Sequence, residues 1–138
     1  MSLKLRDARY IAVWVDENVG ATDIKNMQEA AKELVPSLEI VSVVSSGELR
    51  TWLRKFGSEV TSKLRVVCSS YCAGDGGSSS TWRVINEVRK VAKLKKVPIM
   101  VYKSKGATFE PSHFSKMNMI YYPKTQDEVK AFMINGKT

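Results

Sequence analysis

The chain has 138 residues, a net charge of +8 and an ordinary globular composition, 43% hydrophobic and 26% charged. This composition excludes a disordered or fibrous protein, and no apolar run approaches the length of a membrane-spanning helix, about 20 residues. The first residues lack the apolar stretch of a secretion signal. We therefore expect a single cytoplasmic domain over residues 1–138 that does not bind membranes.

Five apolar segments, taken in chain order, predict five β-strands. The first is uninterrupted and rich in β-branched residues, which is typical of strands buried on both faces of a parallel sheet. The others follow at intervals, each separated from the next by a polar or amphipathic stretch. The expected strands are residues 10–15, 38–44, 64–68, 97–102 and 119–122.

Four amphipathic segments predict the helices between and after these strands. The first stops before Pro36, because a proline disfavours helical backbone in the residue that precedes it. The second and the last begin with the capping patterns Ser45-x-x-Glu48 and Thr125-x-x-Glu128. The inward-facing side chains expected of the four helices are Ile24, Met27, Ala31 and Leu34; Leu49, Trp52, Leu53 and Phe56; Trp82, Ile85, Val88 and Ala92; and Val129, Phe132 and Met133.

Strands that alternate with helices predict right-handed crossovers onto one parallel sheet. For five strands the common order is 2-1-3-4-5, so the expected fold class is α/β, a doubly wound, flavodoxin-like domain. Residues 103–117 show no regular pattern, because Gly106 and Pro111 interrupt any helix there. In this class of fold, ligands meet the carboxyl ends of the strands.

Polar side chains follow several of the predicted strands at that edge. They are Asp16 and Glu17 after the first strand, Ser69 after the third, Lys103 after the fourth and Tyr122 at the end of the fifth. A lysine beside two carboxylates would neutralise them without a metal ion. Alternatively, Lys103 points into solvent and the two acidic residues are solvated carboxylates.

The ends of the strands resemble those of response-regulator receiver domains. The matching segments are Val13-Trp14-Val15-Asp16-Glu17-Asn18, Val97-Pro98-Ile99-Met100-Val101-Tyr102 and Tyr122-Pro123-Lys124-Thr125-Gln126-Asp127-Glu128-Val129, within a likeness that covers about residues 9 to 134. The resemblance implies that Asp16 and Glu17 are a vestige of the acidic pair that binds magnesium in receivers. It places Ser69 at the phospho-acceptor aspartate, with Cys68 or Ser70 there if the alignment slips by one residue.

The resemblance also places Lys103 at the hydroxyl that senses the phosphoryl group and Tyr122 at the lysine paired with it. A serine at the acceptor position is a poor metal ligand and cannot form a labile acyl phosphate. We therefore expect a degenerate pseudo-receiver without phosphotransfer. Such a protein is not an enzyme, uses no metal or other cofactor, and serves as a phosphorylation-independent signalling or protein-interaction domain.

Receivers usually communicate through the face made by their fourth helix, fifth strand and fifth helix. Here this face is rich in aromatic residues and methionine, which are enriched in interface cores. We expect it to dock a protein partner or to form a homodimer, although the two phenylalanines before the fifth strand can instead cover the end of the sheet. The candidate interface residues are Phe109, Phe114, Tyr121, Phe132 and Met133.

Other functional classes have weaker support. A Toll/interleukin-receptor-like or other nucleotide-binding enzyme on the same fold would need Glu17 or Glu87 as its acid, but the opening-strand motif of that family is missing. The Gly/Ser-rich stretch 73–80 lacks the phosphate-binding lysine of a P-loop, and a flexible surface loop is the simpler interpretation.

Nucleic-acid binding rests on net charge alone, since aromatic interleaving and an arginine-rich tail are absent. Two cysteines and one histidine are too few for a zinc site, and Cys68 is expected in the core.

Overall fold

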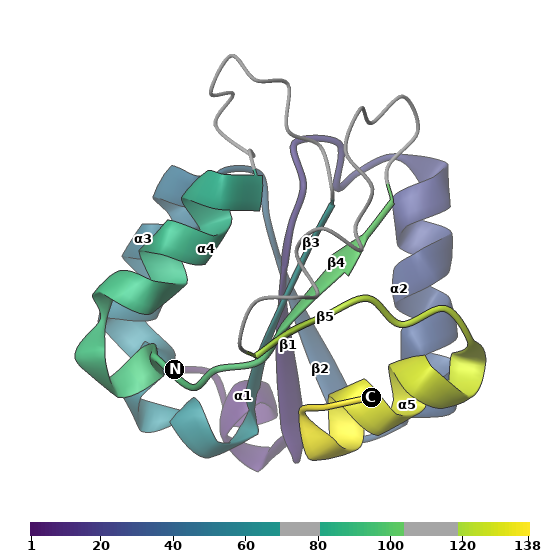
Figure 1. The fold of residues 1–138 in the computed structure, drawn as a ribbon. Coiled ribbons are helices and arrows are strands. Elements are labelled where there is room, and N and C mark those ends of the chain that lie inside the picture. Colours follow the sequence, from purple (N-terminus) through teal and green to yellow (C-terminus); the bar gives the residue numbers. More distant parts are fainter. Residues whose placement is uncertain (70–80, 104–118) are drawn as a thin grey trace.

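The computed structural model describes residues 1–69, 81–103 and 119–138 (Figure 1). Its described strands form one parallel five-stranded sheet in the order β2-β1-β3-β4-β5, which confirms the predicted doubly wound order. The strands are β1 (Tyr10–Val15), β2 (Leu38–Val43), β3 (Leu64–Ser69), β4 (Ile99–Tyr102) and β5 (Ile120–Tyr121).

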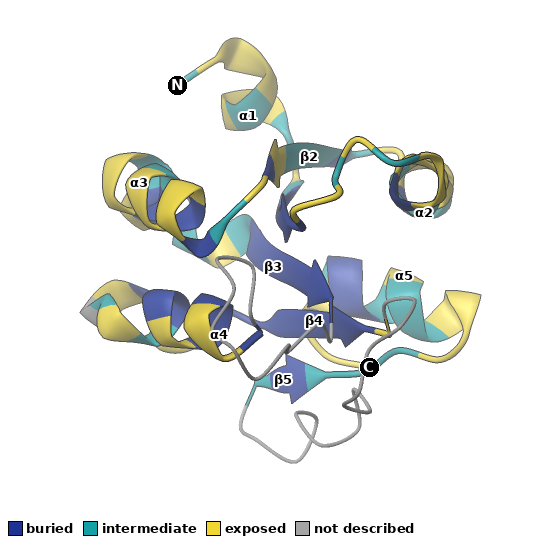
Figure 2. Ribbon diagram, turned by 90° about the horizontal axis from the view of Figure 1, so that it is seen from above, coloured by how far each residue is buried: buried dark blue, intermediate teal, exposed yellow. Residues whose placement is uncertain are grey.

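Helices cover both faces of the sheet. Helices α3 and α4 pack side by side on one face, and α2 and α5 cover the other (Figures 1 and 2). A short helix that the sequence pattern did not predict, α1, precedes β1, and 3₁₀ turns follow α3 and α4. The bounds are α1 (Leu3–Asp7), α2 (Thr22–Leu34), α3 (Ser46–Phe56), α4 (Thr81–Lys90) and α5 (Gln126–Asn135), with 3₁₀ turns at Gly57–Glu59, Thr61–Lys63 and Ala92–Leu94. No helix in the described part of the chain is long and apolar enough to cross a membrane.

Both predicted capping patterns are present. The Ser45 hydroxyl accepts a hydrogen bond from the Glu48 amide at 3.1 Å, and the Glu48 carboxylate in turn accepts one from the Val44 amide. The Thr125 hydroxyl accepts a bond from the Glu128 amide, also at 3.1 Å. These bonds satisfy amide groups that have no partner within the helix, so they fix where α3 and α5 begin.

Two hydrophobic cores lie on opposite faces of the sheet, because successive side chains of a strand point to opposite faces (Figure 2). The core beneath α3 and α4 contains Ile11, Val13, Val15, Leu49, Leu53, Val66, Val84, Ile85, Val88 and Val101 among others. The core beneath α2 and α5 contains Ala12, Trp14, Ile24, Ala31, Val67, Met100, Tyr102, Phe132 and Met133 among others.

The inward faces of α3 and α4 differ in detail from the prediction. Trp82 is 45% exposed, and Val84 takes the inward position instead. Trp52 and Phe56 are half-buried at the edge of the core, with their ring centroids 5.5 Å apart. An aromatic residue at the boundary of an apolar stripe fits the helical pattern whether its ring is buried or exposed, so the neighbouring elements decide its position.

A buried arginine links the sheet to the end of the last helix. Arg65, the second residue of β3, donates hydrogen bonds to the backbone carbonyls of Phe132 at 3.3 Å and Ile134 at 3.2 Å, near the carboxyl end of α5. A positive charge is favourable at that end of a helix, where carbonyl groups carry partial negative charge. Burial lowers the pKa of the Arg65 guanidinium. Gly136, the first residue after α5, has a left-handed backbone with φ of 72° and caps the helix.

Candidate functional site

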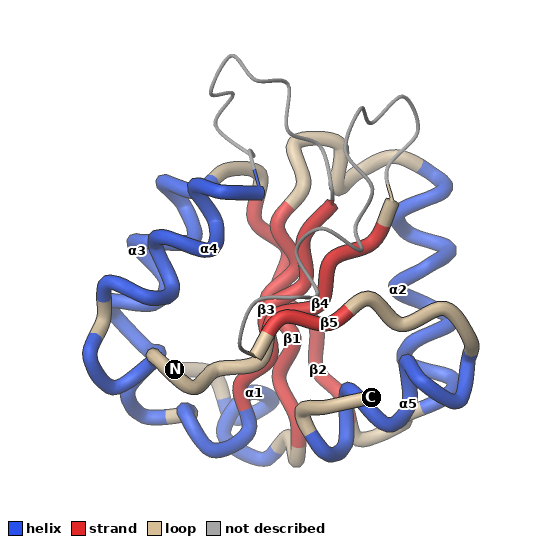
Figure 3. The backbone as a smooth tube through the Cα atoms, in the orientation of Figure 1, coloured by secondary structure: helices blue, strands red, loops and turns tan. Residues whose placement is uncertain are grey.

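The carboxyl ends of the three central strands bring together three of the polar residues in the described structure. Strands β1, β3 and β4 lie next to one another in the sheet (Figure 3). In the parallel register Val15 pairs with Cys68, and Ser69 pairs with Tyr102. Asp16, which follows Val15 directly, therefore leaves the sheet at the level of Ser69 and Tyr102. This is the edge where ligands bind in doubly wound folds.

A chain of buried hydrogen bonds occupies this edge. The Trp14 indole Nε1–H donates to the Tyr102 hydroxyl at 3.2 Å, and that hydroxyl donates to Oδ2 of Asp16. The second carboxylate oxygen, Oδ1, accepts the backbone N–H of Asn18 at 2.8 Å. The side chains lie within the fold: Trp14 is 1%, Asp16 5% and Tyr102 7% exposed. Each oxygen of the Asp16 carboxylate thus has a donor from the protein itself.

The environment keeps the Tyr102 hydroxyl protonated. Burial, followed by the hydrogen bond to the Asp16 carboxylate, raises the pKa of the Tyr102 phenol far above its ordinary value of 10.0. A phenolate beside a carboxylate would place two negative charges side by side in a region of low dielectric constant. Tyr102 therefore acts as a hydrogen-bond donor to Asp16 throughout the neutral range.

Of the two alternatives for Lys103, exposure to solvent is the one that the described residues show, and Tyr102 lies beside Asp16. Both Lys103 and Glu17 are exposed. The ion pairs within residues 1–69, 81–103 and 119–138 join Glu87 to Arg50 and to Lys90, so an ion pair between Lys103 and Asp16 or Glu17 is not among them. The signal in the sequence is a phenol at the end of an apolar run, but such a run does not indicate a partner for the hydroxyl.

Within the described residues, neither of the two other aligned positions, Ser69 and Tyr122, bonds to the Asp16 carboxylate. Ser69 is buried, and its backbone carbonyl accepts a hydrogen bond from the Thr81 hydroxyl at 2.6 Å, which joins the end of β3 to the start of α4. Tyr122 is half-buried after β5, and the Lys124 ammonium lies 5.8 Å from the centroid of its ring. The roles that the resemblance assigns to these two positions remain predictions.

The candidate interface needs a correction. Phe132 and Met133 are fully buried in the core beneath α5, so these two side chains do not contribute to an exposed docking face. Tyr121 is half-buried, and its ring centroid lies 5.9 Å from that of Phe132. Phe109 and Phe114 lie outside the described residues.

The remaining chemical candidates also have defined positions. Cys68 is buried, as expected, whereas Cys72 and His113 lie outside the described residues. Glu87 accepts two hydrogen bonds from Arg50, both at 2.7 Å, and these lower the pKa of its carboxyl group. A carboxyl held ionised in this way is poorly suited to act as an acid. Within the part of the chain that the structure describes, no three His, Cys, Asp or Glu residues lie close enough together to hold a metal ion.

Solved structures of response regulators share this fold. The phosphorylated cyanobacterial phytochrome response regulator RcpA aligns with a TM-score of 0.63 and 20% identity, over 95% of this chain and 98% of its own. A response-regulator receiver domain from Rhodospirillum rubrum gives 0.59 and 9%, over 90% and 91%. The Mn²⁺-bound form of the response regulator Rcp1 gives 0.55 and 12%, over 89% and 91%.

At these identities the likeness establishes the fold, which is that of a receiver domain. No family model matches the chain, and no curated protein matches it by sequence.

Proposed function

We propose that this chain is a receiver-like signalling domain that binds a protein partner without phosphoryl transfer and without catalysing a reaction. The observation that carries the proposal is the buried hydrogen bond from Tyr102 to Asp16, at the edge of the sheet where a receiver would hold its metal ion and phosphoryl group. The shared fold of RcpA and Rcp1 supports a signalling role.

The Tyr102 bond disfavours a divalent cation at Asp16. Magnesium needs an octahedral shell of oxygen ligands and keeps several of its waters. To bind at Oδ2, the ion would have to displace a buried phenol and leave the Trp14 indole N–H without its acceptor. The raised pKa of Tyr102 also prevents that phenol from ionising and serving as a ligand itself.

The resemblance aligns Ser69 with the phospho-acceptor aspartate of receivers, and a serine at this position disfavours phosphorylation. A serine hydroxyl forms a stable phosphate ester rather than a labile acyl phosphate. Ser69 is also 2% exposed, so an incoming phosphoryl donor has little access to it. We therefore expect the domain to keep one conformation whether or not phosphoryl donors are present.

Phosphoryl chemistry can be tested directly. The protein is incubated with acetyl phosphate and Mg²⁺ and examined by intact mass spectrometry, and beryllofluoride binding is followed by fluorine NMR. RcpA, which was crystallised in phosphorylated form, is the positive control. We expect neither a phosphorylated species nor a fluorine signal from bound beryllofluoride. A stable beryllofluoride adduct on this chain would refute the proposal.

Metal binding provides an independent test, since Rcp1 has been crystallised with Mn²⁺. Paramagnetic Mn²⁺ broadens the NMR signals of nuclei near its binding site. Rcp1 should show such broadening around its Mn²⁺ site. In the present chain we expect the indole signal of Trp14 to keep its width up to millimolar Mn²⁺. Selective broadening of that signal at micromolar Mn²⁺ would contradict the role assigned to Tyr102.

A further inference from the structure

The helices on the two faces of the sheet differ in net charge. Helices α3 and α4 together carry six basic and two acidic residues, a net charge of +4. Helices α2 and α5, on the opposite face, together carry three basic and five acidic residues, a net charge of −2. The rest of the chain carries the other +6 of its net charge of +8, so the asymmetry concerns the helices alone. The helices α3 and α4 are therefore the ones suited to an acidic partner.

A groove between α3 and α4 gathers much of this charge. It consists of two adjoining hollows of 190 and 260 Å³ that share Arg50, Glu87 and Lys90. Arg54 lines the first hollow and Arg83 the second, and both arginines are exposed. We call the surface formed by these five residues the α3–α4 groove.

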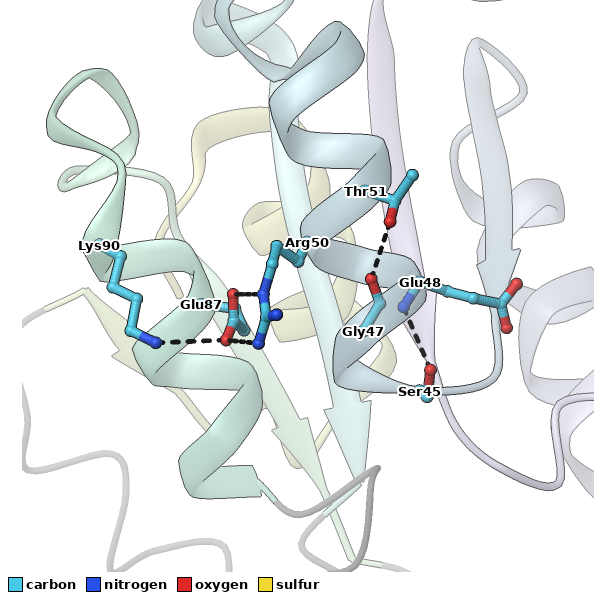
Figure 4. A network of polar contacts seen from close by, with 7 residues as sticks. All are labelled: Ser45, Gly47, Glu48, Arg50, Thr51, Glu87 and Lys90. Atoms are coloured by element: carbon cyan, nitrogen blue, oxygen red, sulfur yellow. Dashed lines mark hydrogen bonds and ion pairs between the residues drawn. The ribbon is translucent and has the colours of Figure 1, made fainter.

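Glu87 forms the floor of the groove and does not neutralise it. The carboxylate is 7% exposed, and Arg50 and Lys90 approach it from opposite sides, at 2.7 and 3.4 Å (Figure 4). One buried negative charge thus faces four basic side chains. Arg54 and Arg83 have no ion pair within the described parts of the chain. The groove therefore carries a net charge of about +3 toward solvent.

The pair with Glu87 also orients Arg50 for a second ligand. Its Nε and Nη2 atoms donate to the two carboxylate oxygens of Glu87, which fixes the plane of the guanidinium across the groove (Figure 4). The side chain is nevertheless 46% exposed. A guanidinium has five N–H groups in a rigid fork, so the remaining ones can bind another carboxylate in bidentate geometry with little further loss of freedom.

We propose that the α3–α4 groove docks an acidic helical segment of a partner protein, whose carboxylates pair with Arg50, Arg54, Arg83 and Lys90. A groove between two packed helices suits a third helix laid along it. Trp82 is exposed at 45% and precedes Asn86, which also lines the second hollow, by one turn of α4. Tryptophan and arginine are enriched where proteins bind tightly.

A protein partner suits this surface better than a nucleic acid. A phosphate backbone is bound by rows of cations that neutralise successive phosphates. Here a carboxylate lies at the centre of the cationic set, and the two adjoining hollows are small. This inference rests on the protein-interaction role proposed above and specifies the chemistry of the partner. It does not depend on the proposed absence of phosphoryl transfer, which is tested by other experiments, so either proposal can fail without the other.

Charge reversal on matched faces tests the inference. The probe is a synthetic amphipathic helical peptide with glutamates along one face, and binding is measured by fluorescence anisotropy and mapped by ¹⁵N chemical shifts. The test variant is Arg54→Glu/Arg83→Glu, which leaves the Arg50–Glu87 pair in place. The control is Lys25→Glu/Lys32→Glu on the exposed side of α2, which makes the same change in net charge.

We expect shifts confined to α3 and α4, an affinity loss of about tenfold or more in the test variant, and about threefold or less in the control. Circular dichroism checks that both variants are folded. Equal losses in the two variants, or an unmodified protein that does not bind the peptide, would overturn the proposal. A DNA duplex or phosphatidylserine vesicles of matched charge are titrated in parallel. Tighter binding of either one through Arg54 and Arg83 would show that the partner class is wrong.

Discussion

Replacing Tyr102 by phenylalanine removes one oxygen atom from the centre of the site and keeps the ring that packs 5.7 Å from Trp14. The substitution leaves two buried polar groups without their partner, namely the indole N–H of Trp14 and Oδ2 of Asp16. No cavity larger than a hydroxyl group is created. The expected loss of stability therefore comes from hydrogen bonding rather than from packing.

The size of the effect follows from these two groups. A hydrogen bond to a charged group contributes about 1.5–3 kcal/mol, and a buried polar group left unpaired costs about 1–3 kcal/mol. Because one of the two lost bonds involves the Asp16 carboxylate, we expect Tyr102→Phe to lower the free energy of unfolding by about 2–4 kcal/mol. Urea unfolding at pH 7, followed by tryptophan fluorescence, measures this difference.

Tyr121→Phe is the matched control. Its ring is also packed against the core, but its hydroxyl is half-buried and contacts the sulfur of Met119 at 3.9 Å. We expect the control to change stability by less than about 0.5 kcal/mol. A double-mutant cycle of Tyr102→Phe with Asp16→Ala, which removes the acceptor, then isolates the coupling between the two side chains. Equal small effects in the two tyrosine variants, or no coupling energy in the cycle, would refute the buried hydrogen bond from Tyr102 to Asp16.

Three further substitutions test other parts of the fold. Gly136→Ala should lower the free energy of unfolding in urea by about 1–3 kcal/mol, because the φ of this residue is +72° and a new Cβ would lie 2.8 Å from Cγ of Pro98. In the control Gly20→Ala the new Cβ has no atom within 4 Å, so the free energy of unfolding should change by less than about 0.5 kcal/mol. Phe56→Ala should cost about 1–2 kcal/mol, less than a fully buried phenylalanine, since its ring is half-buried; a cost above about 3 kcal/mol would contradict that placement. Glu87→Gln should lower the thermal midpoint at pH 7. The difference from the parent protein should shrink below pH 4.5, because the guanidinium bound to Glu87 depresses its carboxyl pKa and the stability that the pair contributes is lost as the pH falls through that lowered pKa. A difference in midpoint that does not change with pH would exclude this linkage.

The strand order and the helix starts could be predicted from the sequence because they depend on local signals. Continuous apolar runs of β-branched residues occur where strands are buried on both faces, and Ser45 and Thr125 provide hydroxyls at the positions that a helix start requires. The five-residue helix α1 was missed because it has no buried residue, so it leaves no periodic trace in the sequence.

The content of the site depends on register, which local patterns do not determine. Tyr102 ends an apolar run, and from the sequence its ring could be assigned to the core but its hydroxyl could not be assigned a partner. Its bond to Asp16 exists because β1, β3 and β4 align so that residues 86 positions apart in the chain end at the same level. The exposure of Trp82 has a similar origin, since the packing of α4 against α3 decides which neighbouring residue turns inward.

The placement of Arg65 has a consequence for the order of events during synthesis. Its guanidinium has three backbone acceptors. The carbonyl of Leu64 is its neighbour, whereas those of Phe132 and Ile134 lie 67 and 69 residues later in the chain. A nascent chain that ends after β4 therefore holds a charged side chain in its central strand without two of its three acceptors, and burying a charge with its hydrogen bonds unmade is costly. We expect the arginine to stay hydrated and β3 to remain open to solvent until α5 has left the ribosomal tunnel. We therefore expect the sheet to complete its folding only after α5 has been synthesised.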